Sequence, residues 1–469
     1  MNKMSQLVYG LCCISMGLSG CQVIQPYQSP TQETPITLVS PEVNLLQNSN
    51  LLHAETAWWE IFNDKQLNGL IELSLKNNHD IQAAYQRLLA ARAIVREQEL
   101  NELPQVTTGA NYQQSKQQQL NNQGNTERRT SRSTQIGFDM QWELDLFGRL
   151  QHLTQSAIAQ SQARAAYLRQ IQLSVIADTA RNYFELCSTQ QQIGLIQEEI
   201  DSWQKTLDIQ QSKLALGRGN PEEIETTQSY LYQAQAQLPA LDAERQRLRY
   251  RLDILTGQDI GQNQQLLAAD KQPVLFQQIS LGDINHLIMQ RPDVVEAERL
   301  YAAQYEQVGA VKAELYPKVQ LGGFLGFFAL RGGDLGTNSQ SYRLMPSLSW
   351  PALHLGSVKA RVNATQAETQ HAEILYRQKV LLAQEEVENA ITAFIHSQNQ
   401  QKLLVQAGHA AQTALNITQK KYQIGTVSYV NVLDNQRQLN NLKQQISLSE
   451  NDSFLQLIKI YKALGVGIT

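Results

Sequence analysis

The residue with the clearest chemistry is a cysteine near the N-terminus. Cys21 ends the run Leu18-Ser19-Gly20-Cys21, which follows Lys3 and an apolar segment at residues 7–18. A cationic start and an apolar core of about 12 residues predict a secretory signal, too short for a permanent membrane helix. The run before the cysteine is typical of the site at which a lipoprotein signal is removed and the cysteine sulfur is acylated. We therefore expect a signal peptide at residues 1–20 and a lipid on Cys21, against the alternative of chance apolar residues around a cysteine.

The other reactive side chains form no convergent catalytic or metal-binding motif. The histidines are scattered, without a His-Glu-x-x-His or Cys-His arrangement, so neither a zinc site nor a nucleophile–base pair is predicted. The glycine-rich run at residues 322–326 falls within an expected strand and does not open a helix, which argues against a nucleotide loop. Cys187 lies beside aromatic residues and is expected to be a buried small hydrophobe. We expect no enzyme, no metal and no cofactor apart from the lipid on Cys21.

Composition excludes a further class of partner. The chain of 469 residues has a formal net charge of −4, and only 17% of its residues are charged. It therefore offers no basic surface for nucleic acid. Three methionines remain after the predicted signal is removed, namely Met140, Met289 and Met345. They form no thioether cluster for a Cu(I) relay.

Two periodicities describe the elements that position these side chains. Residues 135–144 alternate apolar and polar, as a two-faced strand does. From Arg149 to Leu216 there is no proline, and a heptad seam is formed by Ile193, Ile196, Ile200, Trp203, Leu207 and Leu214. About 68 residues at 1.5 Å each predict a helix of roughly 100 Å.

The same plan occurs twice. Trp142, Gly148, Gly217 and Gly257 are each matched 208 residues later by Trp350, Gly356, Gly425 and Gly465. Asp80 and Pro104 are matched 213 residues later by Asp293 and Pro317. A strand-strand-helix-helix unit has therefore been duplicated.

The predicted boundaries follow from this duplication. A tether at residues 21–57, rich in Pro, Gln, Ser and Thr, precedes the first repeat at 58–257. That repeat holds a short helix, a second helix capped by Asp80, a β-hairpin at 105–145, a long helix at 148–217 and a helix at 220–256. A linker at 258–291 leads to the second repeat at 292–469, with a helix, a hairpin at 318–352, a long helix at 356–425 and a helix at 428–464.

The strands suggest a membrane. In the first hairpin we expect a strand at 105–115, a loop at 119–132 and a returning strand from Gln135. Strands of about ten residues suit a tilted transmembrane β-strand, and the alternative is a soluble sandwich. Four strands cannot close a barrel, and lipid does not tolerate an open sheet edge. A membrane-embedded sheet would therefore require several chains to share one barrel.

These motifs together resemble one family. Trp58-Trp59, Asn77-Asn78-His79-Asp80, Gln290-Arg291-Pro292-Asp293, the run from Trp142 to Gly148 and the run from Tyr422 to Asp434 resemble the TolC family of outer membrane factors. The signal with Cys21 is similar to the lipoprotein branch that includes OprM and NodT. The resemblance implies a membrane α+β protein, a homotrimer with a 12-stranded outer-membrane β-barrel, four strands per chain, continuous with a long periplasmic α-helical barrel. It also implies an equatorial collar, which takes in the linker at 258–291.

The resemblance also implies function and location. Such channels are the exit duct of tripartite efflux systems, with a periplasmic adaptor and an inner-membrane transporter of the RND type. Drugs and other small toxic compounds are the expected substrates. Gln22 after the cysteine indicates a lipid-anchored protein of the outer membrane, with most of its mass in the periplasm. A lipid-anchored coiled-coil structural protein of the envelope is the alternative, although it leaves the matched strands without a purpose.

By this resemblance the adaptor docks at the two helix–helix turns. The candidate docking residues are Gly217, Arg218, Gly219, Asn220, Gly425 and Thr426. Gly217 and Gly425 also fit a left-handed position that ends each long helix, and Asn220 or Ser428 could cap the next. Helix capping alone would account for the two glycines.

The expected gate lies just beyond the second turn. Asp434 and Arg437 match a Leu-Asp-x-x-Arg pattern in which the carboxylate lines a constriction and joins a charge network. Three symmetry-related carboxylates repel one another unless cations compensate. The alternative is an ordinary i,i+3 surface ion pair. Where the family prototype has a second Asp one turn earlier, this chain has Asn431, so Val430 and Leu433 are an alternative apolar constriction.

Overall fold

The computed structural model describes residues 24–25, 27–30, 57–120, 124, 126–262, 284–330 and 335–467. The predicted signal peptide, Cys21 and most of the predicted tether lie outside these residues. In chain order the elements are η1 (Trp58–Phe62), α3 (Lys65–Asn77), α4 (His79–Asn101), β1 (Gln105–Leu120), β2 (Thr126–Leu144), α5 (Arg149–Ala215), α6 (Pro221–Gln235), α7 (Leu238–Leu255), α8 (Ile284–Gln290), α9 (Pro292–Ala313), β3 (Lys318–Leu330), η3 (Thr337–Ser339), β4 (Gln340–Ser349), α10 (Leu355–Gln423) and α11 (Tyr429–Leu464).

The chain divides into two compact units. The first contains the described residues within Met1–Thr31, Arg87–Ala165 and Glu296–Arg377, and the second contains those within Gln32–Gln86, Ala166–Val295 and Gln378–Thr469. The first unit holds all four strands. The second holds both helix–helix turns.

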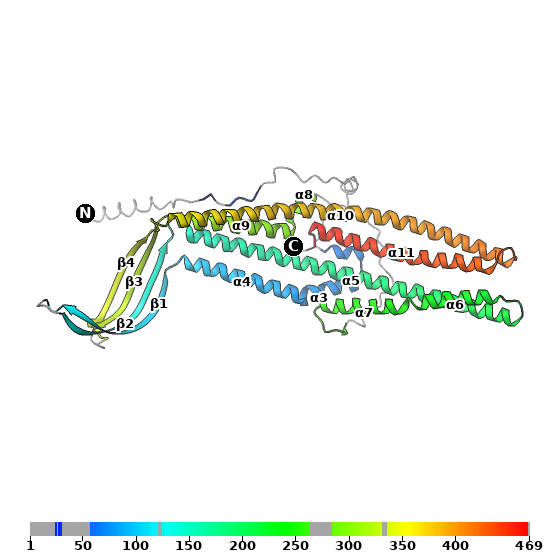
Figure 1. The fold of residues 1–469 in the computed structure, drawn as a ribbon, viewed down its shortest axis with the longest axis horizontal. Helices are drawn as coiled ribbons and strands as arrows, with labels where there is room; N and C mark the ends of the chain where they lie inside the picture. The colour runs from blue at the N-terminus through cyan, green and yellow to red at the C-terminus, as the bar shows by residue number, and fades with distance from the viewer. Residues whose placement is uncertain are drawn as a thin grey trace. The chain divides into compact units, whose positions relative to one another are not determined.

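The strands of the first unit form one antiparallel sheet in the order β1-β2-β3-β4 (Figure 1). The register pairs Phe138 with both Thr108 and Leu325, and Leu325 with Tyr342. Directly paired residues point to the same side of a sheet, and successive residues alternate sides. The register therefore assigns every strand residue to one of two faces.

The two faces differ in chemistry. The face shared by Phe138, Leu325 and Tyr342, called here the apolar face, also carries Val106, Ala110, Tyr112, Ile136, Met140, Trp142, Leu144, Val319, Leu321, Phe327, Leu344, Pro346 and Leu348. The opposite face, called here the polar face, carries Asp139, Glu143, Lys318 and Arg343 among glutamines, serines and glycines, and its apolar residues are Phe324, Phe328, Leu330 and Met345. Leu325, Tyr342 and Leu348 are 65%, 84% and 66% exposed. A sheet with one exposed apolar face and a mostly polar opposite face has the alternation of a membrane barrel.

The first hairpin corrects one expectation. The loop predicted at 119–132 is wrong, because β1 runs to Leu120 and β2 starts at Thr126. Both faces of this part of the hairpin are polar and exposed, so the apolar alternation that marks a strand is missing from the sequence. The hairpin's own hydrogen bonds make it a strand.

The helix predicted at 220–256 is two helices, α6 and α7, interrupted at Ala236–Gln237. A proline lies in the first turn of α7. Proline lacks an N–H group and its ring clashes with the preceding turn, which explains the break. The other long helices begin and end within two residues of the predicted boundaries.

The predicted cap of α4 is also wrong. Asn78, not Asp80, accepts hydrogen bonds from the backbone N–H groups of Asp80 and Ile81, at 2.9 and 3.3 Å. The Asn78 side chain is buried and donates to the carbonyl of Leu255 at 3.0 Å. A residue that caps one helix therefore also holds the end of another.

Aromatic side chains form the core of the second unit near η1. Phe62 packs edge-on against Phe184 with ring centroids 4.8 Å apart, and Phe184 stacks on Phe454 at 4.9 Å. Trp58 stacks on Tyr461 at 5.0 Å. The predicted heptad seam of α5 is confirmed farther along for Ile196, Ile200, Trp203 and Leu207, which are buried. It is wrong at Leu214, which is 39% exposed near the end of the helix.

Candidate functional site

Each long helix ends in a glycine with left-handed backbone. Gly217 has φ 72° and Gly425 has φ 77°. The N–H of Gly217 donates to Leu214 and that of Arg218 to Lys213, while Gly425 donates to Tyr422 and Thr426 to Lys421, all at 2.9 to 3.0 Å. This is the paired bonding of a Schellman motif, and the predicted glycine caps are confirmed. No atom lies within 4 Å of a Cβ built on either glycine, so backbone conformation alone requires glycine there.

The turns expose most of the predicted docking residues. Gly217, Arg218, Asn220, Gly425 and Thr426 are exposed, and Gly219 is half-buried against α5. A Cβ on Gly219 would come within 2.5 Å of the backbone nitrogen of Leu214, which explains this glycine by close approach. Asn220 caps α6 through a bond from the N–H of Glu222 at 3.0 Å. Ser428 makes no such bond to the start of α11.

An apolar residue stands beside each turn and was not among the predicted docking residues. Leu216 is 75% exposed and Ile424 is 74% exposed. The 208-residue offset also relates these two residues, so the repeat could have identified them. Large apolar side chains at such exposure favour contact with a partner.

The predicted gate residues do not pair with each other. Asp434 and Arg437 are both exposed on α11, and no ion pair among the described residues joins them. Instead both contact Tyr230 of α6. The Tyr230 hydroxyl donates to Asp434 Oδ1 at 3.5 Å, and the Arg437 guanidinium lies over the Tyr230 ring, 5.3 Å from its centroid. The structure thus brings together a carboxylate and a guanidinium from one repeat with a phenol from the other.

The neighbouring gate candidates divide by burial. Asn431 is exposed, and its carbonyl accepts from the Asn435 side chain at 2.9 Å. Val430 is half-buried. Leu433 is 1% exposed and packs with Ile200, Trp203 and Leu231 between the two helical hairpins. Leu433 is therefore a core residue, and its burial argues against the expected apolar constriction at this position.

A cation–aromatic cluster joins the two hairpins near their turns. Lys213 Nζ donates to the Tyr422 hydroxyl at 2.8 Å and lies 5.1 Å and 6.0 Å from the ring centroids of Tyr422 and Tyr429. The hydrogen bond to Tyr422 raises the pKa of Lys213. The cluster therefore favours a charged lysine between the turns.

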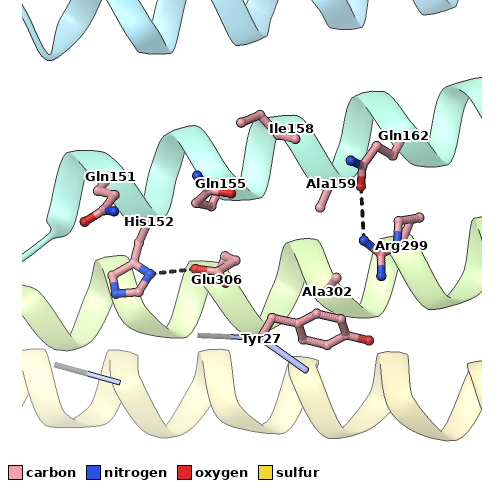
Figure 2. Close-up of a pocket in the computed structure, with 10 residues that line it drawn as sticks. All are labelled: Tyr27, Gln151, His152, Gln155, Ile158, Ala159, Gln162, Arg299, Ala302 and Glu306. Atoms are coloured by element: carbon pink, nitrogen blue, oxygen red, sulfur yellow. Dashed lines mark hydrogen bonds and ion pairs between the residues drawn. The ribbon is translucent and has the colours of Figure 1, made fainter. Parts of the chain in front are cut away.

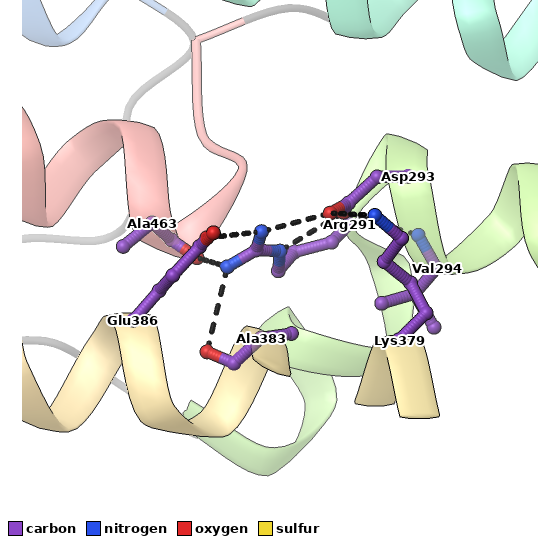
Figure 3. Close-up of polar contacts among 7 residues, drawn as sticks. All are labelled: Arg291, Asp293, Val294, Lys379, Ala383, Glu386 and Ala463. Carbon is purple, nitrogen blue, oxygen red and sulfur yellow. Dashed lines mark hydrogen bonds and ion pairs between the residues drawn. The ribbon is translucent and has the colours of Figure 1, made fainter. Parts of the chain in front are cut away.

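Arg291 makes a denser polar contact in the second unit (Figure 3). Its side chain is buried and donates two bonds to Asp293 at 3.0 and 2.9 Å, one to Glu386 at 2.6 Å, and one each to the carbonyls of Ala463 and Ala383 at 2.6 and 3.4 Å. A guanidinium has five N–H donors, and each of these five contacts can use one. Burial acts to lower the pKa of Arg291, but the bonds to Asp293 and Glu386 outweigh it and raise the pKa.

The first unit contains a pocket of about 380 Å³ between α5 and α9 (Figure 2). Inside it His152 Nδ1 lies 2.6 Å from Glu306 Oε2, and both side chains are largely buried. Tyr27 closes another part of the pocket and donates to Glu298 at 2.7 Å. Burial and the bond to Glu298 raise the pKa of Tyr27, so its hydroxyl remains a donor. Among the described residues, no group of three or more His, Cys, Asp or Glu could hold a metal ion.

Among the helices that the structure describes, none is both long enough and apolar enough to cross a membrane.

Known proteins share this architecture over almost the whole chain. The solved outer-membrane channel OprN is 31% identical, with a TM-score of 0.89, and the match covers 95% of this chain and 99% of OprN. Nodulation protein T of Rhizobium leguminosarum bv. trifolii is 28% identical over 460 residues, 97% of this chain and 95% of that protein. The cation efflux system protein CusC of Escherichia coli (strain K12) is 25% identical over 463 residues, 97% of this chain and 98% of that protein.

The solved neighbours are trimeric outer-membrane channels that combine a helical barrel with a sheet, and this chain, mostly helical with four strands, has the same fold. The predicted resemblance to the TolC family of outer membrane factors is confirmed. The model of the outer membrane efflux protein family matches residues 70–258 and 284–466, and the chain therefore belongs to that family.

Proposed function

We propose that three copies of this chain form an outer-membrane duct that exports drugs or other small toxic compounds. An inner-membrane transporter of the RND type would deliver them through a periplasmic adaptor, and a lipid on Cys21 would add an anchor. The observation that carries the proposal is the sheet. It has one apolar face and leaves β1 and β4 as open edges. Open edges are not tolerated in lipid, and three such sheets would close one barrel of twelve strands.

The dimensions of the apolar face support this placement. From Trp142 to Thr134, the partner of Tyr112, is eight residues along β2. That is about 27 Å along the strand and roughly 20 Å across a membrane at the usual tilt. Tyr112 lies at one end of this band and Trp142 at the other. Aromatic residues at both borders are typical of outer-membrane barrels.

The gate proposed here is Tyr230 with Asp434 and Arg437, with Asn431 one turn earlier on α11. An exposed cation–π contact contributes about 0.5–1 kcal/mol, and the 3.5 Å bond to Asp434 adds little. Three symmetry-related copies at about 1 kcal/mol each would change the ratio of open to closed channels on the order of 100-fold. The closed state is therefore a modest preference, which an adaptor could reverse.

The proposed adaptor surface is the pair of turns with Gly217, Arg218, Gly219, Asn220, Gly425 and Thr426. Exposed Leu216 and Ile424 support this assignment, because they give each turn an apolar contact for a partner. The capping geometry explains the glycines but leaves these two side chains without a packing role in the described chain.

Single-channel conductance of the purified trimer in planar bilayers tests the proposal. Wild type is compared with Asp434→Ala, Arg437→Ala and Tyr230→Phe. We expect the wild-type channel to be nearly closed. Arg437→Ala removes the cation–π contact and should raise the ratio of open to closed channels by up to about 100-fold. Asp434→Ala and Tyr230→Phe remove only the 3.5 Å bond and should have smaller effects. Asp452→Asn, on α11 but about five turns away, is the matched control and should behave like wild type.

The outcomes separate the alternatives. Variants that conduct no better than a nearly closed wild type would remove the gate and retain the duct. An elongated monomer or dimer without conductance would contradict the duct and favour a coiled-coil structural protein.

A further inference from the structure

The hairpin of β1 and β2 continues beyond the apolar band. Tyr112 pairs with Thr134 at the border of the band. Beyond this pair, β1 runs to Leu120 and β2 begins at Thr126, and the paired residues on both faces are mostly polar. The second hairpin ends sooner, because the pairing of β3 with β4 stops at Phe327 and Gln340. The extension is therefore a feature of the first repeat.

The charges on this extension are sorted by face. Arg132 pairs with Gln114, Lys116 with Thr130 and Arg128 with Gln118, which assigns all three cations to the continuation of the apolar face. All three are exposed. Arg129 and Glu127 lie on the opposite face, where Ser115 and Ser131 confirm the assignment by a hydrogen bond of 2.8 Å. Within the described part of the extension, the continuation of the apolar face carries three cations and no acidic residue.

Arg132 is the cation nearest the lipid head groups, and Lys116 and Arg128 lie successively farther out along the hairpin. Arg132 is four residues from Ile136, the last apolar residue of β2 on this face. Four residues span about 13 Å along a strand and roughly 10 Å along the membrane normal. Thr130, the partner of Lys116, and Arg128 are six and eight residues from Ile136, which is roughly 15 and 20 Å along the normal. The polar region of each leaflet is roughly 5–8 Å thick, and a long arginine side chain reaches back toward it. Tyr112 stands between the apolar band and the cations, as an interfacial aromatic does.

We propose that Lys116, Arg128 and Arg132 form a surface that binds the phosphate groups of lipids in the outer leaflet. This inference rests on the proposed membrane channel. Guanidinium groups bind phosphate with two parallel hydrogen bonds. Continuity with the apolar face favours a lipid over a soluble anion, because a ligand that covers both surfaces must be amphiphilic. The lipid would then border the barrel with its acyl chains on the apolar face and its phosphates on the cations.

Native mass spectrometry of the full-length trimer, purified in detergent, tests the surface with defined lipids. The trimer is titrated with lipid A carrying both phosphates, and separately with synthetic lipid A carrying none. We expect several phosphorylated lipids to stay bound, and retention to fall about fivefold for each cation removed, since one such cation near a charged membrane surface contributes that much. The variant Lys116→Gln, Arg128→Gln, Arg132→Gln should therefore lose on the order of 100-fold in affinity.

Two controls make the result specific. Arg129→Gln removes the neighbouring arginine from the opposite face and should retain lipid like wild type. Inorganic phosphate at the lipid's concentration should not displace the lipid, which separates a lipid surface from a general phosphate site. Equal retention of phosphorylated and unphosphorylated lipid, or an equal loss in Arg129→Gln, would overturn the proposal.

Measuring the conductance of the same samples separates a failure of the proposed lipid surface from a failure of the proposed channel. A conducting trimer that does not distinguish the two lipids would contradict only the lipid surface. A protein that neither assembles as a trimer nor conducts would contradict the proposed function, and the lipid surface with it.

Discussion

Replacement of Arg291 by methionine should loosen the end of α11. The variant keeps an apolar chain of similar length but removes all five N–H donors, including those to Asp293, Glu386 and the carbonyl of Ala463. Asp293, whose side chain is only 11% exposed, would lose its guanidinium partner. Breaking a buried ion pair from one side typically costs about 3–5 kcal/mol, because it leaves an uncompensated charge. Lys379, 3.9 Å from Asp293, remains in place and puts the expected loss near the lower end of that range.

Hydrogen–deuterium exchange of the assembled trimer measures this loss where it occurs. Global unfolding of a membrane trimer is not a two-state process, whereas local opening gives a free energy for one segment. At 1.4 kcal/mol for each factor of ten, a loss of about 3 kcal/mol should speed exchange of the last α11 amides roughly 100-fold. Amides at the start of α11 should exchange as in wild type.

Two further variants decide whether burial is the reason. Arg247 makes two bonds to Glu244 at 2.7 and 2.5 Å, but both side chains are exposed. Arg247→Met should therefore change local exchange less than about fivefold. Arg291→Met combined with Asp293→Asn should recover part of the loss, because no unpaired carboxylate remains. An effect of Arg291→Met no larger than that of Arg247→Met would refute the reasoning.

Two other predictions concern α5. Gly217→Ala should lower the thermal unfolding midpoint of the trimer, because alanine at φ 72° costs about 1 kcal/mol or more. Gly194→Ala should raise the midpoint, because Gly194 lies in the middle of the helix with open space around a Cβ. The reverse order of midpoints would contradict the capping role of Gly217. Burial raises the pKa of Cys187 to about 12, so only about one thiol in 10⁴ is a thiolate at pH 8. Maleimide should therefore label Cys187 only after unfolding. Labelling of the native trimer within minutes would show that the thiol is accessible.

Local sequence signals predicted most of the helices and their ends. The heptad seam of α5 and the glycines at 217 and 425 needed only spacing and backbone preference, and the structure confirms them apart from Leu214. The break before α7 could also have been predicted, because proline in a helix interior is costly. The long apolar periodicity favoured a single helix instead. The extension of β1 and β2 was not readable. Both faces of the extension are polar and exposed to solvent, so no alternation of apolar residues marks it as a strand.

The site was less predictable because its contacts join distant residues. Asp434 and Arg437 were identified by resemblance, but their shared partner Tyr230 lies 204 residues from Asp434 in the other repeat. Arg291 stood in a motif, yet its acceptors at Ala383 and Ala463 are 92 and 172 residues away. Periodicity reports which face of a helix is buried, and it does not report which helix covers that face.

The duplication shows which contacts the fold itself requires. Trp142 donates to the carbonyl of Glu102 at 2.9 Å, and Trp350 donates to that of Leu315 at 3.0 Å. The two donors are related by the 208-residue offset and the two acceptors by the 213-residue offset. Both hairpins are therefore held by an equivalent hydrogen bond from a tryptophan to a backbone carbonyl.

A second matched contact keeps the acceptor and changes the donor. Asn78 holds the carbonyl of Leu255, and at the equivalent place Arg291 holds that of Ala463. Because a buried carbonyl at a helix end must be satisfied, either donor meets the structural need. In the second repeat Asp293 and Glu386 compensate the charge of Arg291, whereas Asp80, the match of Asp293, lies beside the uncharged Asn78 in the first repeat. The same freedom applies at Asp434, where the first repeat has Thr226: with the backbone fixed by shared contacts, each repeat can carry different chemistry.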